Sequence, residues 1–153
     1  MGGRDFASAR TVASDKGRVL VVDDEAAIRA LVAKIIERAG FAVETARDGR
    51  EAIEMLQTSD FDVLVIDLMM PNVDGYGVVD FLRERGGPQP AVILVTAADS
   101  AAVRKLDGAF VHSVLRKPFD IDVLADLISA AAQTIRREHQ GGEVVPFPER
   151  EVC

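Results

Sequence analysis

Acidic, hydroxyl and amine side chains follow four apolar segments of this sequence. Asp23 and Asp24 come directly after the run VLVV, and Asp67 comes directly after VLVI. Thr96 and Lys117 follow the later runs AVILV and SVLR. Carboxylates held close together raise one another's pKa unless a cation lies among them. If the four segments converge, we therefore expect a cation at the point where they meet.

These residue types favour phosphoryl transfer assisted by Mg²⁺, which prefers oxygen ligands and takes one or two carboxylates while keeping several waters. A carboxylate can also act as a nucleophile and form an aspartyl phosphate. The metal and a lysine would neutralise charge on the transferring group. Zinc is not expected, because His112 and His139 are far apart in the sequence and Cys153 is the last residue.

Each of these residues also has an ordinary interpretation when it is taken alone. Asp23 or Asp24 could cap the helix that follows, and Asp67 could be a turn residue. Thr96 could be a strand-end hydroxyl, and Lys117 a solvated charge. These interpretations do not explain why all of the residues follow apolar runs.

The apolar runs and the segments between them predict alternating strands and helices. Most runs are continuous and rich in Val, Ile and Leu, which is typical of strands covered on both faces in a parallel sheet. The expected strands are 19–22, 41–45, 63–66, 91–95 and 113–115. Helical spacing of apolar residues occurs at 28–39, about 48–59, around 78–82, about 99–106 and at 123–135. Right-handed crossovers then give an open, doubly wound α/β sheet, in which functional groups gather beyond the carboxyl ends of the strands.

The length of 153 residues fits one domain, which we place at 18–139. We expect a flexible arm at 1–17 and a flexible tail at 140–153. The net charge of −7 argues against a nucleic-acid partner, since phosphate contacts need clustered Lys and Arg. No apolar run is long enough to span a membrane. A single cysteine and the lack of a secretory signal predict a cytoplasmic location.

Four motifs occur in the order and spacing of a known family. VLVVDDE, DVLVIDLMMPNVDGYG, VILVTA and LRKPF together resemble the receiver domains of two-component response regulators, over about residues 18–138. The resemblance implies a five-stranded parallel sheet in the order 2-1-3-4-5, with a flavodoxin-like three-layer αβα architecture.

The resemblance also implies roles for individual residues. Asp67 would be the phosphoacceptor, with Asp24 touching Mg²⁺ directly and Asp23 largely through water. The backbone carbonyl of Met69 would be a further metal ligand, and Mn²⁺ or Ca²⁺ could substitute for Mg²⁺.

Two further positions complete the implied site. Thr96 matches the hydroxyl that binds a phosphoryl oxygen, and Ala97 matches the small neighbour that leaves room for it. Lys117 matches the lysine that pairs with the phosphate, and the Lys117-Pro118 bond resembles the family's cis peptide.

The implied activity is that of a regulatory phosphoacceptor, not of an enzyme acting on other substrates. Asp67 would take a phosphoryl group from the phosphohistidine of a histidine kinase and lose it slowly by hydrolysis. The new charge would draw Thr96 inward and shift an equilibrium on the face formed by the helix near 99–106, the strand 113–115 and the last helix. That face is the expected surface for a protein target.

The sequence departs from the family pattern at three positions. Val114 stands where the family usually has Tyr or Phe, and valine is too short to act as the same switch. Met69 and Ala98 flank the place of the attacking water, and neither side chain can hydrogen-bond it. We therefore expect a long-lived aspartyl phosphate.

Several functions remain open from the sequence alone. The short segment after residue 139 suggests a stand-alone receiver that switches partner binding. A phosphorelay carrier or phosphate sink, exchanging phosphate with a histidine phosphotransfer protein, is the alternative. A receiver-like scaffold that is never phosphorylated conflicts with the intact acids, Thr96 and Lys117. A haloacid-dehalogenase-type phosphatase needs a second Asp where Met69 stands, and a dinucleotide enzyme needs a glycine-rich turn after the first strand.

Overall fold

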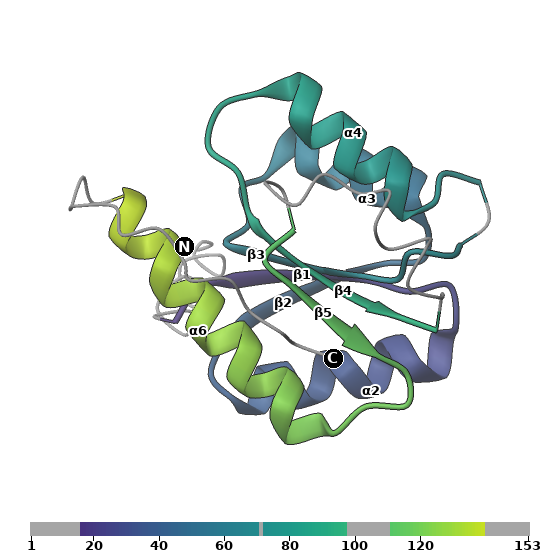
Figure 1. Ribbon diagram of the computed structural model, residues 1–153, viewed down its shortest axis with the longest axis vertical. Helices are drawn as coiled ribbons and strands as arrows, with labels where there is room; N and C mark the ends of the chain where they lie inside the picture. The colour runs from purple at the N-terminus through teal and green to yellow at the C-terminus, as the bar shows by residue number, and fades with distance from the viewer. Residues whose placement is uncertain (1–15, 71, 98–110, 140–153) are drawn as a thin grey trace, which may run out of the picture.

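The protein is a three-layer α/β structure built around a parallel sheet (Figure 1). The computed structural model describes residues 16–70, 72–97 and 111–139, the last four of these by their backbone alone. The five strands lie in the order β2-β1-β3-β4-β5, and every neighbouring pair is parallel. They are β1 (Arg18–Val22), β2 (Ala42–Ala46), β3 (Val63–Ile66), β4 (Ala91–Thr96) and β5 (Ser113–Arg116). The predicted fold class and strand order are confirmed.

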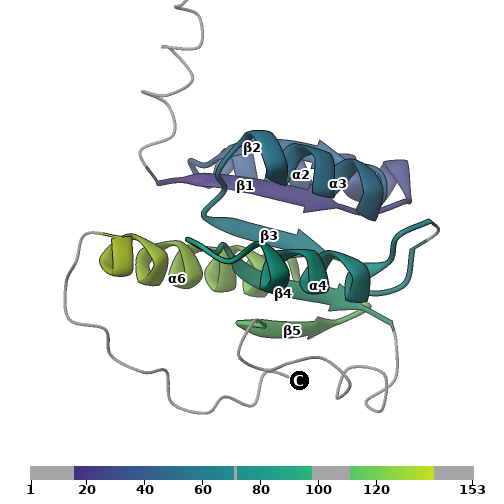
Figure 2. The same ribbon diagram turned by 90° about the horizontal axis from the view of Figure 1, so that it is seen from above.

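Helices cover both faces of the sheet, as Figures 1 and 2 show. One face carries α2 (Ala26–Arg38) and α6 (Ile121–His139), and the other carries α3 (Gly49–Thr58) and α4 (Gly75–Arg85). The helix expected near 99–106 lies outside the described residues. Most of the predicted arm at 1–17 and all of the tail at 140–153 do so as well, so the division into arm, domain and tail remains a prediction.

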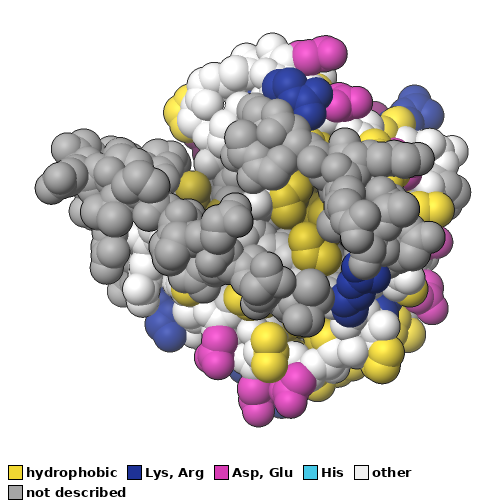
Figure 3. All heavy atoms as spheres, in the orientation of Figure 1, with side chains coloured by type: hydrophobic (Ala, Val, Ile, Leu, Met, Phe, Trp, Pro, Cys, Tyr) yellow, Lys and Arg dark blue, Asp and Glu magenta, His cyan; other side chains and the backbone are white. Residues whose placement is uncertain are grey.

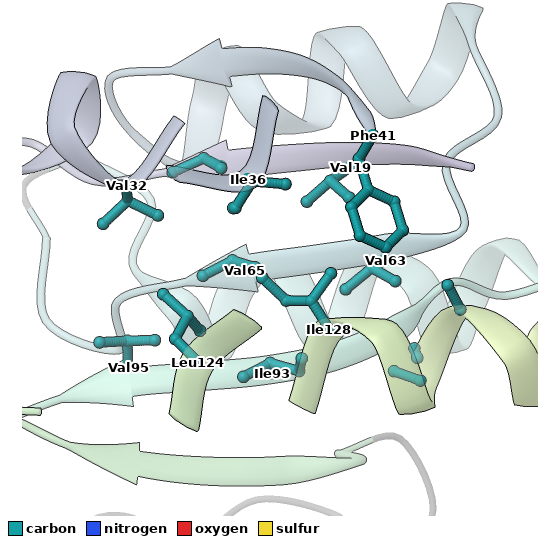
Figure 4. Packing of buried hydrophobic residues seen from close by; sticks show 14 of the residues in the cluster. Val19, Val32, Ile36, Phe41, Val63, Val65, Ile93, Val95, Leu124 and Ile128 are labelled. Atoms are coloured by element: carbon teal, nitrogen blue, oxygen red, sulfur yellow. The ribbon is translucent and has the colours of Figure 1, made fainter. Parts of the chain in front are cut away.

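The apolar strands are buried on both faces because alternate side chains point to opposite helical layers. In β1, Val19 and Val21 pack toward α2 and α6, whereas Leu20 and Val22 pack toward α3 and α4. Figure 4 shows the first of these layers, where α2 and α6 residues such as Ile36 and Ile128 lie over the sheet. This burial on both faces holds the sheet rigidly, and it therefore also fixes the positions of the residues that directly follow the carboxyl ends of the strands.

The register of the sheet aligns the carboxyl ends of the central strands. Val22 pairs with Ile66, so the residues that follow them, Asp23 and Asp67, emerge at the same level. The next strand beside β3 is β4, and its last residue, Thr96, pairs with Arg116 of β5, which directly precedes Lys117.

Within the described residues, no helix has the length and apolar character needed to cross a bilayer.

Candidate functional site

Three carboxylates lie together at the carboxyl edge of the sheet. One oxygen from each of Asp23, Asp24 and Asp67 lies within 4.8 Å of the others. Asp23 and Asp67 are buried, with 6% and 7% of their surface exposed, while Asp24 is exposed. Burying carboxylates is costly unless positive charge or hydrogen bonds compensate them. The site must therefore contain groups that balance this charge.

Lys117 supplies part of that balance. Its Nζ atom donates to Asp67 Oδ2 at 2.8 Å and lies 3.5 Å from Asp23 Oδ2. Burial acts to lower the pKa of Lys117, but the hydrogen bond and charge of Asp67, together with Asp23, outweigh burial and raise it. One ammonium beside three carboxylates leaves a negative excess, which favours the binding of a further cation.

Asp23 is fixed through each of its polar groups. Its backbone N–H donates to the Ala46 carbonyl at 3.2 Å, extending the β1–β2 pairing by one residue. Its Oδ1 atom accepts a hydrogen bond from the Glu25 backbone N–H at 2.9 Å. Its carbonyl accepts a hydrogen bond from Arg29 Nη1 at 2.7 Å, and its Oδ2 faces Lys117. The first carboxylate of the acidic pair is thus rigidly oriented toward the site.

Asp67 is held by the start of the loop that follows it. Its Oδ1 atom accepts from the Met69 N–H at 3.1 Å, and Leu68 between them is fully buried. Gly75 closes this loop by donating its N–H to the Leu68 carbonyl at 2.9 Å. A Cβ at Gly75 would lie 2.8 Å from Leu68 Cα, so glycine is required by this close approach. These hydrogen bonds hold the first residues of the loop, Leu68 and Met69, in place directly after Asp67.

The far end of the same loop is attached to the N-terminus of α3. Asn72 Nδ2 donates to Asp48 Oδ2 at 3.0 Å, and the Gly49 N–H donates to the Val73 carbonyl at 3.0 Å. Asp48 also caps α3, because its Oδ1 accepts from the Glu51 N–H at 2.9 Å. That backbone hydrogen bond, followed by the smaller effects of Asn72 and Arg47, lowers the pKa of Asp48. We call the Asp48–Asn72 and Gly49–Val73 contacts the loop clamp.

The remaining predicted positions lie where the register places them. Thr96 is fully buried at the end of β4, and its carbonyl accepts from the Lys117 N–H at 3.0 Å. Ala97 is exposed, and Ala98 lies outside the described residues. Val114 is partly buried and packs against the core layer beneath α3 and α4. The Lys117–Pro118 peptide bond is cis.

The donor set fits a hard divalent cation. The donor set consists of carboxylate oxygens alone, and its negative charge exceeds the single positive charge of Lys117. Because Asp24 is exposed, the cluster is accessible to solvent. Mg²⁺ prefers such a set, because it binds through few carboxylates and retains waters. Asp23, Asp24 and Asp67 are the side chains that would hold the ion.

The family of the chain follows from comparison with known sequences. A family model described as the response regulator receiver domain matches residues 19–129. The chain belongs to this family. The matched segment includes every residue of the carboxylate cluster as well as Thr96 and Lys117.

Several regulatory proteins and receiver-domain structures are similar to this chain. The chain is 37% identical over 128 residues to the response regulator MprA of Mycolicibacterium vanbaalenii, which covers 82% of this chain and 54% of MprA. It is 36% identical over 108 residues to the transcriptional regulatory protein TcrA of Mycobacterium tuberculosis, covering 70% of this chain and 42% of TcrA. The signal receiver domain of a response regulator from Bermanella marisrubri is 34% identical, with a TM-score of 0.69, covering 74% of this chain and 96% of that one. The chain thus spans about half the length of the curated relatives it matches.

Sequence reasoning did not identify Arg29, Asp48 or Asn72 as contributors. Asp48 carries a detectable signal, because Asp at this position and Glu51 three residues later form a capping pattern before a helix. Arg29 and Asn72 carry none, since their partners are a backbone carbonyl and a residue 24 positions away.

Proposed function

We propose that this receiver accepts a phosphoryl group on Asp67 from the phosphohistidine of a histidine kinase, in a reaction that depends on Mg²⁺. The observation that carries the proposal is the position of Lys117, whose Nζ lies 2.8 Å from Asp67 Oδ2 within a cluster of three carboxylates. A cluster with only a structural role would gain nothing from so much uncompensated charge.

The chemistry follows from the groups around Asp67. A carboxylate oxygen of Asp67 attacks phosphorus, the P–N bond of the phosphohistidine breaks, and the imidazole leaves with the bonding electrons. Lys117 is placed to neutralise negative charge on the phosphoryl oxygens. The buried Thr96 hydroxyl, at the end of the next strand, is the proposed donor to one of those oxygens.

The metal would be held by Asp23, Asp24 and Asp67, with the Met69 carbonyl as a further proposed ligand. When bound, Mg²⁺ would offset the charge of the acids and of the incoming phosphoryl group. Mn²⁺ or Ca²⁺ could occupy the same oxygen set. The protein's own contribution is to keep Asp23 and Asp67 fixed before the donor arrives.

The phosphodonor needs a surface around the acceptor. Large apolar side chains are exposed in elements that begin at the carboxyl edge of the sheet: Leu31 on α2, Met69 after β3, and Ile121 and Val123 at the start of α6. Exposed apolar surface on a soluble protein is available for contact with a partner protein. On the face shown in Figure 3, the described acidic and basic side chains are interspersed. We propose that the four apolar side chains contact the donor protein, and that the partners are other signalling proteins in the cytoplasm.

The experiment that tests the proposal is phosphorylation by a small phosphodonor such as acetyl phosphate. Incubation with Mg²⁺ should produce a single slower band on a phosphate-affinity gel, and EDTA should abolish it. Asp67→Asn should not be phosphorylated. Asp62→Asn changes an acid at the amino end of β3, the end away from the site, and should be phosphorylated like the wild type. Labelling of Asp67→Asn at the wild-type level would contradict the assignment.

A further inference from the structure

Arg29 contacts the site through the backbone, not through a carboxylate. Its Nη1 atom donates to the Asp23 carbonyl at 2.7 Å. Within the described part of the chain, the ion pairs formed at the site are those of Lys117 with Asp23 and Asp67, and Arg29 forms none. The guanidinium therefore acts on the peptide that joins Asp23 to Asp24.

The position of Arg29 in its helix explains how it reaches this carbonyl. Arg29 lies in the first turn of α2, and helical side chains lean toward the N-terminus of their helix. A cation there opposes the helix dipole, which favours acidic residues, and α2 has none in its first turn and no side-chain cap. The contact with Asp23 gives a reason for a residue that the helix itself disfavours.

The consequence for the site concerns Asp24. Asp23 is held by Ala46, Glu25 and Lys117, whereas Asp24 is exposed and follows the peptide whose carbonyl Arg29 binds. Fixing that peptide plane limits where the Asp24 side chain can lie. We propose that Arg29 is a positioning residue that orients the Asp23–Asp24 peptide so that both carboxylates face one divalent cation. This inference rests on the proposed function.

The proposal can be tested because charge and positioning predict opposite results. If Arg29 acted only through its charge, removing it would strengthen the binding of a divalent cation to the anionic cluster. If it positions the acids, removing it weakens that binding, and partners that orient metal ligands typically contribute about tenfold or more to affinity. The sign of the change therefore separates the two effects.

The experiment measures the affinity for Mn²⁺ alone by electron paramagnetic resonance, without any phosphodonor. Arg29→Met should bind Mn²⁺ about tenfold more weakly than the wild type. Lys34→Met removes the same charge from an exposed position on the same helix and should bind equally or slightly more tightly. Arg29→Lys, which keeps a donor, should recover part of the loss. Binding by Arg29→Met that equals or exceeds that of the wild type would overturn the proposal.

Two further results complete the test. In the wild-type protein, the Arg29 side-chain Nε should show an NMR order parameter close to that of the backbone, and mobility like that of an exposed arginine would contradict the contact even if Arg29→Met failed to fold. If the wild type does not bind Mn²⁺, or if Asp67→Asn does not weaken that binding, the proposed function is rejected and this inference with it. Wild-type binding with an unaffected Arg29→Met rejects this inference alone.

Discussion

The ammonium of Lys117 lies 2.8 Å from the Asp67 carboxylate, although 50 positions separate the two residues in the sequence. The contact exists because β3, β4 and β5 are parallel neighbours whose carboxyl ends share one edge. The sheet thus brings a carboxylate and its counter-charge together before any ligand is present.

Lys117 should contribute to stability through this contact. Lys117→Met leaves the buried Asp23 and Asp67 carboxylates without their ammonium. The side chain of Lys117 is 21% exposed, so we expect a loss in the free energy of unfolding of about 2 kcal/mol, less than for a fully buried pair. Urea unfolding in EDTA measures this loss, and Mg²⁺ should reduce it by replacing the missing cation. An equal loss with and without Mg²⁺ would argue against metal binding at these acids.

The same contact predicts a dependence on alkaline pH. The pKa of Lys117 is raised above its usual value of 10.5, so the folded state holds this proton more tightly than the unfolded chain does. The stabilisation is fully present below pH 10.5 and is lost as the pH rises through the folded-state pKa. The difference in unfolding free energy between wild type and Lys117→Met should therefore shrink above that pH. A difference that stays constant to higher pH would show that Lys117 stabilises by packing alone.

The loop clamp should couple Asp48 to Asn72. Asn72 has a φ of 63°, which glycine adopts without strain, so Asn72→Gly removes the side-chain contact without distorting the backbone. Its effect on the entropy of the unfolded chain cancels in a double-mutant cycle. Asp48→Ser keeps a cap for α3 but cannot hold Asn72 in the same way. A double-mutant cycle on unfolding free energy should give a coupling of about 0.5–1 kcal/mol, since the pair is near the surface. Additive effects would mean that the contact does not contribute to the stability of the loop.

Phosphorylated Asp67 should be long-lived. The Met69 side chain is 59% exposed beside the acceptor and cannot hydrogen-bond an attacking water. Met69→Asn introduces an amide that can, and it should shorten the half-life of the aspartyl phosphate several-fold. Release of inorganic phosphate after removal of the donor measures this rate. Wild-type hydrolysis within seconds at neutral pH would contradict the expectation.

Much of the fold could be predicted because buried strands and buried helix faces need apolar residues in continuous runs or at helical spacing. The expected strand 63–66 coincides with β3, and the helical spacing expected at 28–39 overlaps α2. The acids, Thr96 and Lys117 could be selected because each directly follows or ends an apolar run. Their roles in phosphoryl transfer remain predictions.

Other features could not be predicted because they depend on long-range or backbone contacts. Arg29 gave no signal, since its acceptor is a main-chain carbonyl that any residue at position 23 would present. Asn72 reaches Asp48 only because the loop after β3 folds back over the N-terminus of α3. Gly49 is required by the Val73 carbonyl, which would lie 2.0 Å from a Cβ there, and spacing alone does not reveal that neighbour.

The most direct test of the central claim is the chemical identification of the phosphorylated residue. Borohydride reduces an aspartyl phosphate to homoserine, which peptide mass spectrometry locates in the sequence. After incubation with acetyl phosphate and Mg²⁺, homoserine should appear at position 67, and it should be absent when EDTA replaces Mg²⁺. Homoserine at position 23 or 24 with Asp67 unchanged, or equal conversion of Asp67 in EDTA, would contradict the account.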